Sequence, residues 1–193
     1  MQIVFATNNS NKVKEIQALI DGKMDILSLK DVQCFEELSE TQETLVGNAI
    51  QKAQYLYDNY GKDCFADDTG LLISALNDEP GVYTARYAGP QRDANDNMDL
   101  VLTNLEGKED RSAKFQTAIV LIIKGTVTTF VGEARGTIAM SRQGEEGFGY
   151  DPIFIPEGEV RSFAEMPLSE KNKISHRGRA VAQLVEFLNN DKY

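Results

Sequence analysis

Two adjacent acids interrupt an apolar run near the middle of the chain and are the clearest candidates for chemistry. Asp67 and Asp68 directly follow Cys64–Ala66, and Thr69 and Gly70 come next. An apolar run before such residues predicts a buried strand that ends in a turn, and strand ends in α/β proteins commonly carry ligand-binding groups. Because side chains alternate across a strand, only one of the two acids faces a given cleft. A turn that merely caps the next segment is the alternative.

A polar cluster between a predicted strand and a predicted helix is the second candidate. The cluster is Thr7–Lys12, and an apolar run of strand length precedes it. A helix that begins at such a loop offers backbone N–H groups and the positive end of its dipole to an anion. We expect Asn8 and Asn9 to adopt left-handed backbone angles there. The glycine spacing of a Walker loop is absent, and an ordinary N-cap by Ser10 or Asn11 is the alternative.

Two later stretches add aromatic and basic groups. Arg142–Pro152 is a stretch of 11 residues with three glycines, and loops of this length are commonly functional. Its Phe148 and Tyr150 are flat rings that can stack on a nucleobase. His176 and Arg177 lie in the first turn of a predicted helix, where positive charge opposes the helix dipole. Such a charge is tolerated more readily when it holds an anion.

Periodicity indicates the elements that position these groups. A helical pattern runs from about Thr44 to Tyr60 and stops at Gly61. A long hairpin is expected from two strand patterns that are separated by Lys124–Gly125. Further strands are expected at residues 2–6, 25–29 and from 64, and further helices at about 14–20, 93–105 and 175–189. These patterns predict an α/β protein.

Composition limits the classes of function. The chain of 193 residues fits one large domain or two closely fused lobes. Thirty acidic residues against 20 basic ones give a net charge of −10, which argues against binding to nucleic acid or anionic lipid. No apolar run approaches the roughly 20 residues that a membrane span needs.

The cysteines and the first residues indicate a compartment. Cys34 and Cys64 are the only cysteines, and such a pair fits reduced core thiols better than a disulfide. The chain begins with a strand-like run and not with a basic, apolar leader. We therefore expect a cytoplasmic protein.

Together the candidate groups suit one class of ligand. Acids can hold a hard cation, while basic groups and backbone N–H groups can hold phosphates. With the aromatic loop, they suit a nucleoside triphosphate with Mg²⁺. The groups are the Thr7–Lys12 loop, Asp67 and Asp68, the Gly147–Asp151 segment, and Lys171 with His176 and Arg177.

Five blocks of the chain resemble the signature blocks of the inosine triphosphate pyrophosphatase family, also called the Ham1/RdgB-like family. These enzymes remove non-standard purine nucleotides from the nucleotide pool. The blocks stand in the family's order and extend over nearly the full chain. They are Thr7–Lys12, Phe65–Leu71, Pro80–Gly89, Gly147–Phe154 and Ser175–Gly178.

The resemblance implies hydrolysis of ITP, dITP and XTP to the monophosphate and pyrophosphate, with Mg²⁺. It implies a single domain over residues 1–193, with a mixed, elongated β-sheet, helices on both sides and two lobes around a central active-site cleft. It also implies a homodimer. Asp68 would be the general base and a metal ligand. Glu40 would be a second metal ligand, with Glu36, Glu37 and Glu43 as nearby alternatives.

The other matching positions would bind the substrate. The phosphates and sugar would contact Thr7, Asn8, Asn9, Ser10, Asn11, Lys12, Lys52, Thr69 and Lys171. The nucleobase would be surrounded by Phe148, Gly149, Tyr150, Asp151, His176 and Arg177. This chain has Asn8 where the family frequently has glycine and Thr69 where it frequently has serine, and both replacements keep the required chemistry.

A mechanism follows as a hypothesis. Asp68, or Asp67 if the faces are reversed, would orient or deprotonate a water that attacks the α-phosphorus. Lys12, Lys52 and Lys171 would neutralise the leaving pyrophosphate. Donors from Arg177 would suit a 6-oxo purine and reject the 6-amino group of adenine. The alternatives are a nucleotide-sensing module without catalysis and a related pyrophosphatase for other nucleotides.

Overall fold

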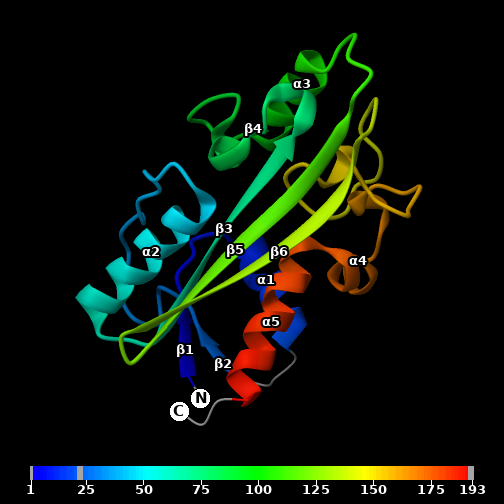
Figure 1. Cartoon of the computed structure of the whole chain (residues 1–193). Coiled ribbons are helices and arrows are strands. Elements are labelled where there is room, and N and C mark those ends of the chain that lie inside the picture. The colour runs from blue at the N-terminus through cyan, green and yellow to red at the C-terminus, as the bar shows by residue number, and fades with distance from the viewer. Residues whose placement is uncertain (1, 21–23, 191–193) are drawn as a thin grey trace. The chain divides into compact units, whose positions relative to one another are not determined.

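The computed structural model describes residues 2–20 and 24–190, and Figure 1 shows its elements. The strands are β1 (Gln2–Phe5), β2 (Asp25–Leu27), β3 (Cys64–Ile73), β4 (Glu79–Pro80), β5 (Ser112–Ile123), β6 (Thr126–Ile138) and β7 (Phe154–Pro156). The α-helices are α1 (Ser10–Ile20), α2 (Leu45–Tyr60), α3 (Ala94–Asn104), α4 (Leu168–Ile174) and α5 (His176–Asn190). Short 3₁₀ helices lie at Ser74–Leu76, Gly81–Arg86, Asp151–Ile153 and Phe163–Glu165.

The strands form a mixed sheet. β1 pairs in parallel with β2 and with β3, whereas β4 pairs antiparallel with β3 and β7 antiparallel with β6. The strand order is β2-β1-β3-β5-β6-β7, and β4 lies beside β3. β5 and β6 are neighbours joined by the turn Lys124–Gly125. The mixed α/β class and the long hairpin are therefore confirmed.

The chain forms two compact units. Unit 1 holds the described residues of Met1–Asp68, Thr117–Gly132 and Arg177–Tyr193, and unit 2 holds Thr69–Gln116 and Glu133–His176. β3, β5 and β6 each contribute residues to both units. The two units are described separately below.

Unit 1 has apolar side chains on both faces of its strands, as the period of two in a strand requires. On one face, strand residues such as Phe5, Phe65 and Leu121 pack with α1 and α5. On the other face, alternate residues such as Ala66 and Val120 pack with α2. Figure 1 shows α2 on one side of these strands and α1 with α5 on the other. The predicted helices on both sides of the sheet are thus present in this unit.

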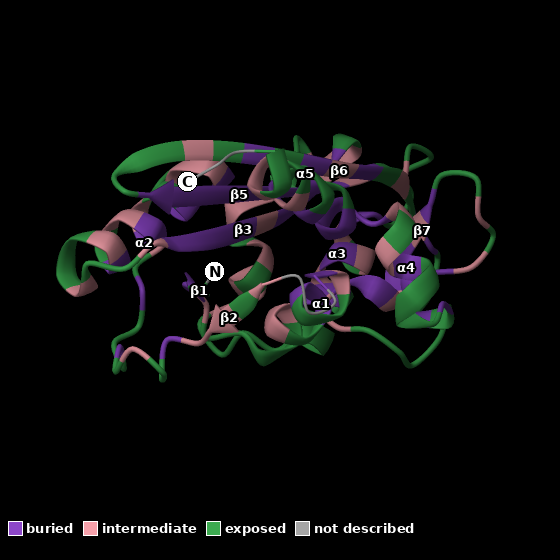
Figure 2. Ribbon diagram, turned by 90° about the horizontal axis from the view of Figure 1, so that it is seen from below, coloured by how far each residue is buried: buried purple, intermediate pink, exposed green. Residues whose placement is uncertain are grey.

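Unit 2 has a single core cluster. Leu71 of β3 and Phe115 of β5 pack there with Val101 of α3. The segment after β6 supplies Tyr150 and Phe163 to the same cluster. Figure 2 shows β3 and β5 coloured as buried over most of their lengths, so their polar residues lie close to apolar cores. This burial matters for the acids of β3.

The helix at 44–60 shows how local signals set the boundaries. Thr44 is its N-cap, and the Thr44 side chain accepts a hydrogen bond from the backbone N–H of Gly47. Gly61 ends the helix with φ +60, in the left-handed region that favours glycine. Both expected boundaries are confirmed.

Two expectations for the fold are wrong. β3 does not end at the acids but continues through Asp67, Asp68 and Gly70 to Ile73. The turn-like composition misled because buried cations and polar partners compensate the acids within the strand. The second error is α4, a helix that the sequence patterns did not predict.

The remaining expectations concern cysteines and membranes. Cys34 and Cys64 are both free and buried, so the prediction of reduced core thiols is confirmed. Within residues 2–20 and 24–190, no helix has the length and apolar character that crossing a membrane requires.

Candidate active site

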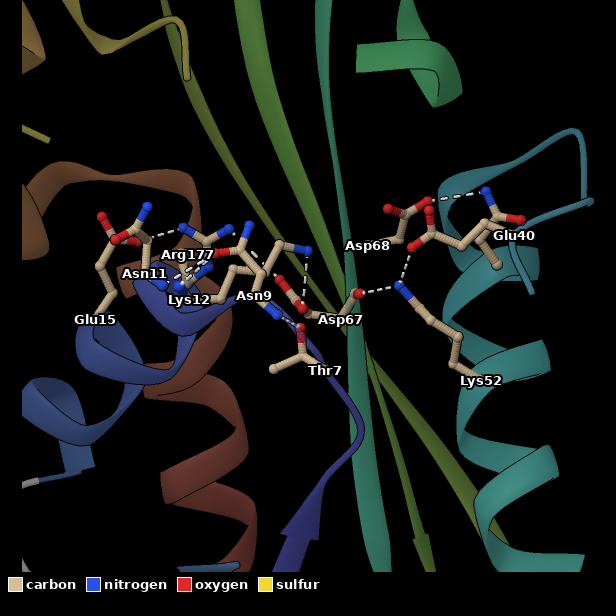
Figure 3. A network of polar contacts seen from close by, with 11 residues as sticks. Thr7, Asn9, Asn11, Lys12, Glu15, Glu40, Lys52, Asp67, Asp68 and Arg177 are labelled. Atoms are coloured by element: carbon tan, nitrogen blue, oxygen red, sulfur yellow. Dashed lines mark hydrogen bonds and ion pairs between the residues drawn. The ribbon is translucent and has the colours of Figure 1, made fainter. Parts of the chain in front are cut away.

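β3 presents its two acids to different surroundings. Asp67 follows Phe65 by two residues and lies on the face that packs with α1 and α5, while Asp68 follows Ala66 and lies on the α2 face. In Figure 3 the two side chains point away from each other, toward Lys12 and toward Glu40. The expected alternation is confirmed, although it occurs in mid-strand and not at a strand end.

Asp67 is surrounded by cations. Its side chain is 0% exposed, and its Oδ1 accepts a hydrogen bond of 3.0 Å from Lys12 Nζ. Its Oδ2 lies 3.5 Å from Arg177 Nη2, and its backbone oxygen accepts a bond of 2.7 Å from Lys52 Nζ. Burial alone would raise the pKa of Asp67, but Lys12, Arg177 and Lys52 together hold it below the ordinary value. Asp67 therefore ionises more readily than an ordinary aspartate and is a poorer proton acceptor.

Arg177 lies within the same buried network. Its side chain is 2% exposed, and its Nη1 donates to the Glu15 carboxylate of α1. The guanidinium thus holds carboxylates from two elements, as a buried charge requires. Arg177 was predicted to donate to a purine 6-oxo group. In this structure its Nη1 and Nη2 groups contact carboxylates.

Asp68 has a different environment from Asp67. It is 7% exposed, and its Oδ2 accepts a hydrogen bond of 3.0 Å from Asn48 Nδ2 of α2. Burial raises the pKa of Asp68, and the charge of Glu40 adds to the rise. Lys52 and Lys12 act against it without reversing it. Asp68 is thus the better proton acceptor of the two acids.

Glu40 reaches this face of β3 through Lys52. Lys52 Nζ donates to Glu40 Oε1 at 2.5 Å, and the Lys52 side chain is almost completely buried. Figure 3 shows the Glu40 carboxylate beside that of Asp68. Of the alternatives, Glu36 instead accepts a bond of 2.8 Å from the Tyr60 hydroxyl. The charge of Glu40 is close enough to act on the Asp68 carboxyl.

The Thr7–Lys12 loop corrects two expectations. Asn9 is the N-cap of α1, because its Oδ1 accepts bonds from the backbone N–H groups of Asn11 and Lys12 at 3.0 and 3.3 Å. The cap is therefore neither Ser10 nor Asn11. Asn8 and Asn9 do not have positive φ; for Asn9 the reason is that a capping residue adopts extended angles. Thr7 also supports the loop, since its Oγ1 accepts from Asn9 N at 3.2 Å.

In unit 2, the predicted nucleobase loop is organised by one carboxylate. Asp151 Oδ2 accepts a bond of 2.8 Å from Phe148 N and one of 2.6 Å from Lys171 Nζ. Lys171 Nζ also lies 5.2 Å from the centre of the Phe148 ring. The Asp151 and Lys171 side chains are almost completely buried. The structure therefore brings together Phe148 and Asp151, which were predicted beside the nucleobase, and Lys171, which was predicted to contact the phosphates and sugar.

Tyr150 and His176 lie in the core of unit 2. Tyr150 is 3% exposed, and its hydroxyl donates to Thr84 O at 2.8 Å. The His176 ring stacks on Phe115, with centroids 4.5 Å apart. The burial of Tyr150 argues against its predicted stacking on a nucleobase and favours a support role for the loop. Of the flat rings, Phe148 is the one that is only partly buried.

Two further predicted residues are partly accessible. Thr69 follows Asp68 on β3 and is half-buried. Gly149 is also half-buried and has φ +64, a backbone conformation that favours glycine. Both lie in unit 2.

Comparison with known proteins identifies the family. The sequence pattern of the Ham1 family matches residues 3–187. The chain belongs to the Ham1 family. Because the match covers nearly the whole chain, the resemblance stated from the five blocks is confirmed.

Relatives of this Ham1 protein are similar over nearly their full lengths. A dITP/XTP pyrophosphatase of Flavobacterium johnsoniae is 53% identical over 188 residues, which cover 97% of this chain and 98% of the relative. A protein of the same name from Bacillus subtilis is 43% identical over 191 residues, covering 97% and 96%.

Solved structures agree with this assignment. A HAM1 protein from Coxiella burnetii is 38% identical and superposes with a TM-score of 0.91 over 99% of this chain and 100% of that one. The Ham1 protein of Staphylococcus aureus is 34% identical, with a TM-score of 0.90 over the full length of both chains.

Two residues of the network were missed in the sequence. Asn48 binds Asp68 from α2, and Glu15 binds Arg177 from α1. The sequence contained a signal for Asn48, since this residue lies four positions before Lys52 and therefore shares its helix face. Glu15 gave none, because glutamate is ordinary on a helix and its partner is 162 residues away.

Proposed function

We propose that this chain is a nucleoside-triphosphate pyrophosphatase that hydrolyses dITP, XTP and ITP to the monophosphate and pyrophosphate. The observation that carries the proposal is the contrast between the two acids of β3. Asp67 is held as an anion among cations, whereas Asp68 has a raised pKa on the opposite face. Relatives named dITP/XTP pyrophosphatase support the substrate class.

In this proposal Asp68 accepts a proton from the water that attacks the α-phosphorus. A new bond forms between the water oxygen and phosphorus, and the bond from phosphorus to the oxygen that bridges to the β-phosphate breaks. The bonding electrons leave with pyrophosphate. A carboxylate with a raised pKa is better matched to this proton transfer than one with a lowered pKa.

Lys12 and Lys52 are two lysines that lie beside the acids. Both are close enough to Asp67 to donate to it. We assign them to the charge of the triphosphate, because fixed cations stabilise charge that grows on transferred phosphoryl oxygens. Burial lowers the pKa of Lys12, and the charges of Lys52 and Arg177 add to this, while Asp67 opposes it.

Asp68 and Glu40 fit the ligand chemistry of Mg²⁺. Magnesium prefers hard oxygen ligands and is often bound by one or two carboxylates together with substrate phosphates. The described residues include no group of three or more His, Cys, Asp or Glu that could hold a metal, which agrees with a site completed by substrate. When bound, the ion would polarise phosphate oxygens and lower the pKa of a bound water.

Nucleobase recognition is assigned to unit 2. Phe148 is held by Asp151 and Lys171, and its partly buried ring is suited to stacking on a purine. Thr69 and Gly149 belong to the same proposed substrate site. The homodimer, the cytoplasmic location and the cleft that the resemblance implies stay predictions.

The decisive experiment measures pyrophosphate release from dITP, XTP, ITP, GTP, ATP and dTTP at equal concentration, with Mg²⁺ or with EDTA. We expect metal-dependent release from the first three nucleotides, at rates orders of magnitude above those for the others. Uniform release would retain the phosphate chemistry and contradict the assigned specificity. Binding of dITP without any release would instead support a nucleotide sensor.

A further inference from the structure

Asn48 is a completely buried polar residue in the first turns of α2. Its Oδ1 accepts a hydrogen bond of 2.8 Å from the backbone N–H of Gln42. Its Nδ2 donates a bond of 3.0 Å to Asp68 Oδ2. Because Gln42 N can only donate and the Asp68 carboxylate can only accept, these two partners fix which end of the amide faces each of them.

This amide connects Asp68 to the segment that carries Glu40. Gln42 is two residues from Glu40, and a second α2 residue, Gln51, binds Thr41 between them. Gln51 Oε1 accepts from Thr41 N at 3.0 Å, and Gln51 Nε2 donates to Thr41 Oγ1 at 2.9 Å. The segment is therefore attached to α2 at consecutive residues, and the Asn48 attachment also reaches Asp68.

The amide N–H of Asn48 can orient the Asp68 carboxylate by a hydrogen bond, but it cannot accept a proton from it. Asp68 is buried beside the carboxylate of Glu40. Two such groups repel each other, and the charge of Lys52 acts against the resulting rise in the pKa of Asp68. A fixed amide on Oδ2 limits rotation of the Asp68 carboxylate. Outer-shell groups of this kind commonly orient metal-binding carboxylates.

We propose that Asn48 is a positioning residue that fixes the Asp68 carboxylate relative to Glu40 and thereby sets the affinity of this pair for a divalent cation. The proposal rests on the function proposed above, which assigns both acids to a metal. It places Asn48 in contact with an acid of the site and not with the substrate.

The test compares Asn48→Leu, which keeps the side-chain size but removes both hydrogen bonds, with the wild-type chain. Mn²⁺ replaces Mg²⁺ as the probe, and its binding without nucleotide is measured by electron paramagnetic resonance. We expect Mn²⁺ binding to weaken by about 10- to 100-fold, the range typical for loss of an outer-shell group. Turnover of dITP should fall by a similar factor, whereas its KM at saturating metal should change little.

Gln51→Leu is the matched control. It removes the neighbouring attachment between α2 and the Glu40 segment but leaves the bond to Asp68 in place. We expect Gln51→Leu to bind Mn²⁺ like the wild type. An equal loss in both variants would overturn the proposal, because it would assign the effect to anchoring of the segment.

A second substitution, Asn48→Ser, covers the case in which Asn48→Leu does not fold. The serine hydroxyl is tolerated in a polar site but is too short to reach both partners, so the same loss of Mn²⁺ binding is expected. Normal Mn²⁺ affinity and turnover in a folded Asn48 variant would overturn the proposal. Mn²⁺ binding that depends on Asn48, in a chain without activity on dITP or XTP, would support the positioning role and contradict the proposed function.

Discussion

Asp67 and Asp68 are chemically identical neighbours, yet the structure gives them opposite electrostatic environments. The lowered pKa of Asp67 reflects attraction to Lys12, Arg177 and Lys52 that exceeds the cost of burial. The raised pKa of Asp68 reflects burial first and the charge of Glu40 next. The first acid therefore stabilises the folded state as an anion, and the second destabilises it when ionised. This difference provides a test at the level of single residues.

Asp67→Asn should lower thermal stability at pH 7, whereas Asp68→Asn should not. Asp68→Asn removes a buried negative charge whose ionisation is unfavourable, so Tm should be unchanged or higher. Its kcat for dITP should fall by about 10²- to 10⁴-fold, the usual contribution of a general base. Asp67→Asn leaves buried cations without their counter-charge, which typically costs about 3–5 kcal/mol. Calorimetry and steady-state kinetics on both variants provide the measurement.

The pair also serves as its own control, since both substitutions make the same chemical change one residue apart. If Asp67→Asn kept its Tm and lost all turnover while Asp68→Asn remained active, the two roles would be reversed. Retained binding of dITP by inactive Asp68→Asn would separate catalysis from substrate binding.

Glu15 permits a further test of the buried network. Its carboxylate accepts from Arg177, so Glu15→Gln should loosen the guanidinium that also contacts Asp67. Because one member of a buried ion pair is lost, we expect the free energy of unfolding to fall by several kcal/mol. Urea denaturation measures this change, and Glu186→Gln, an exposed site on α5, is the control. Equal stability of both variants would contradict a structural role for the pair.

At the scale of elements, periodicity correctly predicted the helices and strands whose boundaries are set by local interactions. α2 with its Thr44 cap and Gly61 stop, and the hairpin of β5 and β6, follow the expected residues closely. β3 did not, because its central acids look like turn residues. What keeps them in a strand is the set of cations and amides that other elements bring to them, and such long-range compensation is not visible in a local pattern.

The candidate site was predictable to a similar degree. The signature blocks contained the residue types that the structure gathers, such as Asp67 with Lys12 and Asp151 with Lys171. The partner of each group was not predictable. The sequence did not indicate that Arg177 holds the carboxylates of Glu15 and Asp67, since a pairing between α1 and α5 depends on how distant segments pack. The Asn9 cap was missed for a local reason, because three neighbouring residues offered equally suitable side chains.

A substitution of Gly147 tests whether the Asp151 contacts shape the predicted nucleobase loop. It has φ +76, and a Cβ there would lie 2.2 Å from Asp151 Oδ2. Asp151 cannot move away without loosening its bonds to Phe148 and Lys171. Gly147→Ala should therefore raise the KM for dITP by about tenfold, equivalent to losing about 1.4 kcal/mol of binding. It should also lose about 1–2 kcal/mol of stability through its left-handed backbone.

Gly158→Ala isolates the contribution of the backbone. Gly158 has φ +85, and a Cβ there would meet nothing within 4 Å. This variant should lose a similar amount of stability in urea denaturation while its kinetic constants stay normal. A normal KM for Gly147→Ala would show that the Asp151 contact does not shape the substrate site.

At the scale of the whole molecule, protons held by buried groups link the fold to pH. The chain is acidic, with a net charge of −10, yet several groups of the core must stay neutral. Burial raises the pKa of Tyr150, and Tyr87 adds to this. Burial also raises the pKa of Cys34 and, with help from the charge of Asp63, raises that of Cys64 to about 12. These groups make alkaline solution unfavourable for the folded state.

Cys64 is the group on which this linkage is most easily measured. Its thiol is completely buried and donates to Ala53 O at 3.3 Å. A folded-state pKa above the unfolded value near 9.0 means that the contribution of Cys64 to stability is fully present below pH 9 and is lost as pH rises toward 12. Three pKa units correspond to at most about 4 kcal/mol. The free energy of unfolding, from urea titrations between pH 8 and 11, should therefore fall steadily.

Cys64→Ser separates this contribution from the others, because a hydroxyl keeps the bond to Ala53 O but does not ionise in this range. The variant should be less stable than the wild type at pH 8, since it buries a more polar group, and its stability should decline less between pH 9 and 11. The difference between the two slopes measures the proton that Cys64 retains on folding. Parallel slopes would mean that the folded protein tolerates the thiolate, and that alkaline loss of stability comes from Tyr150, Cys34 and other groups.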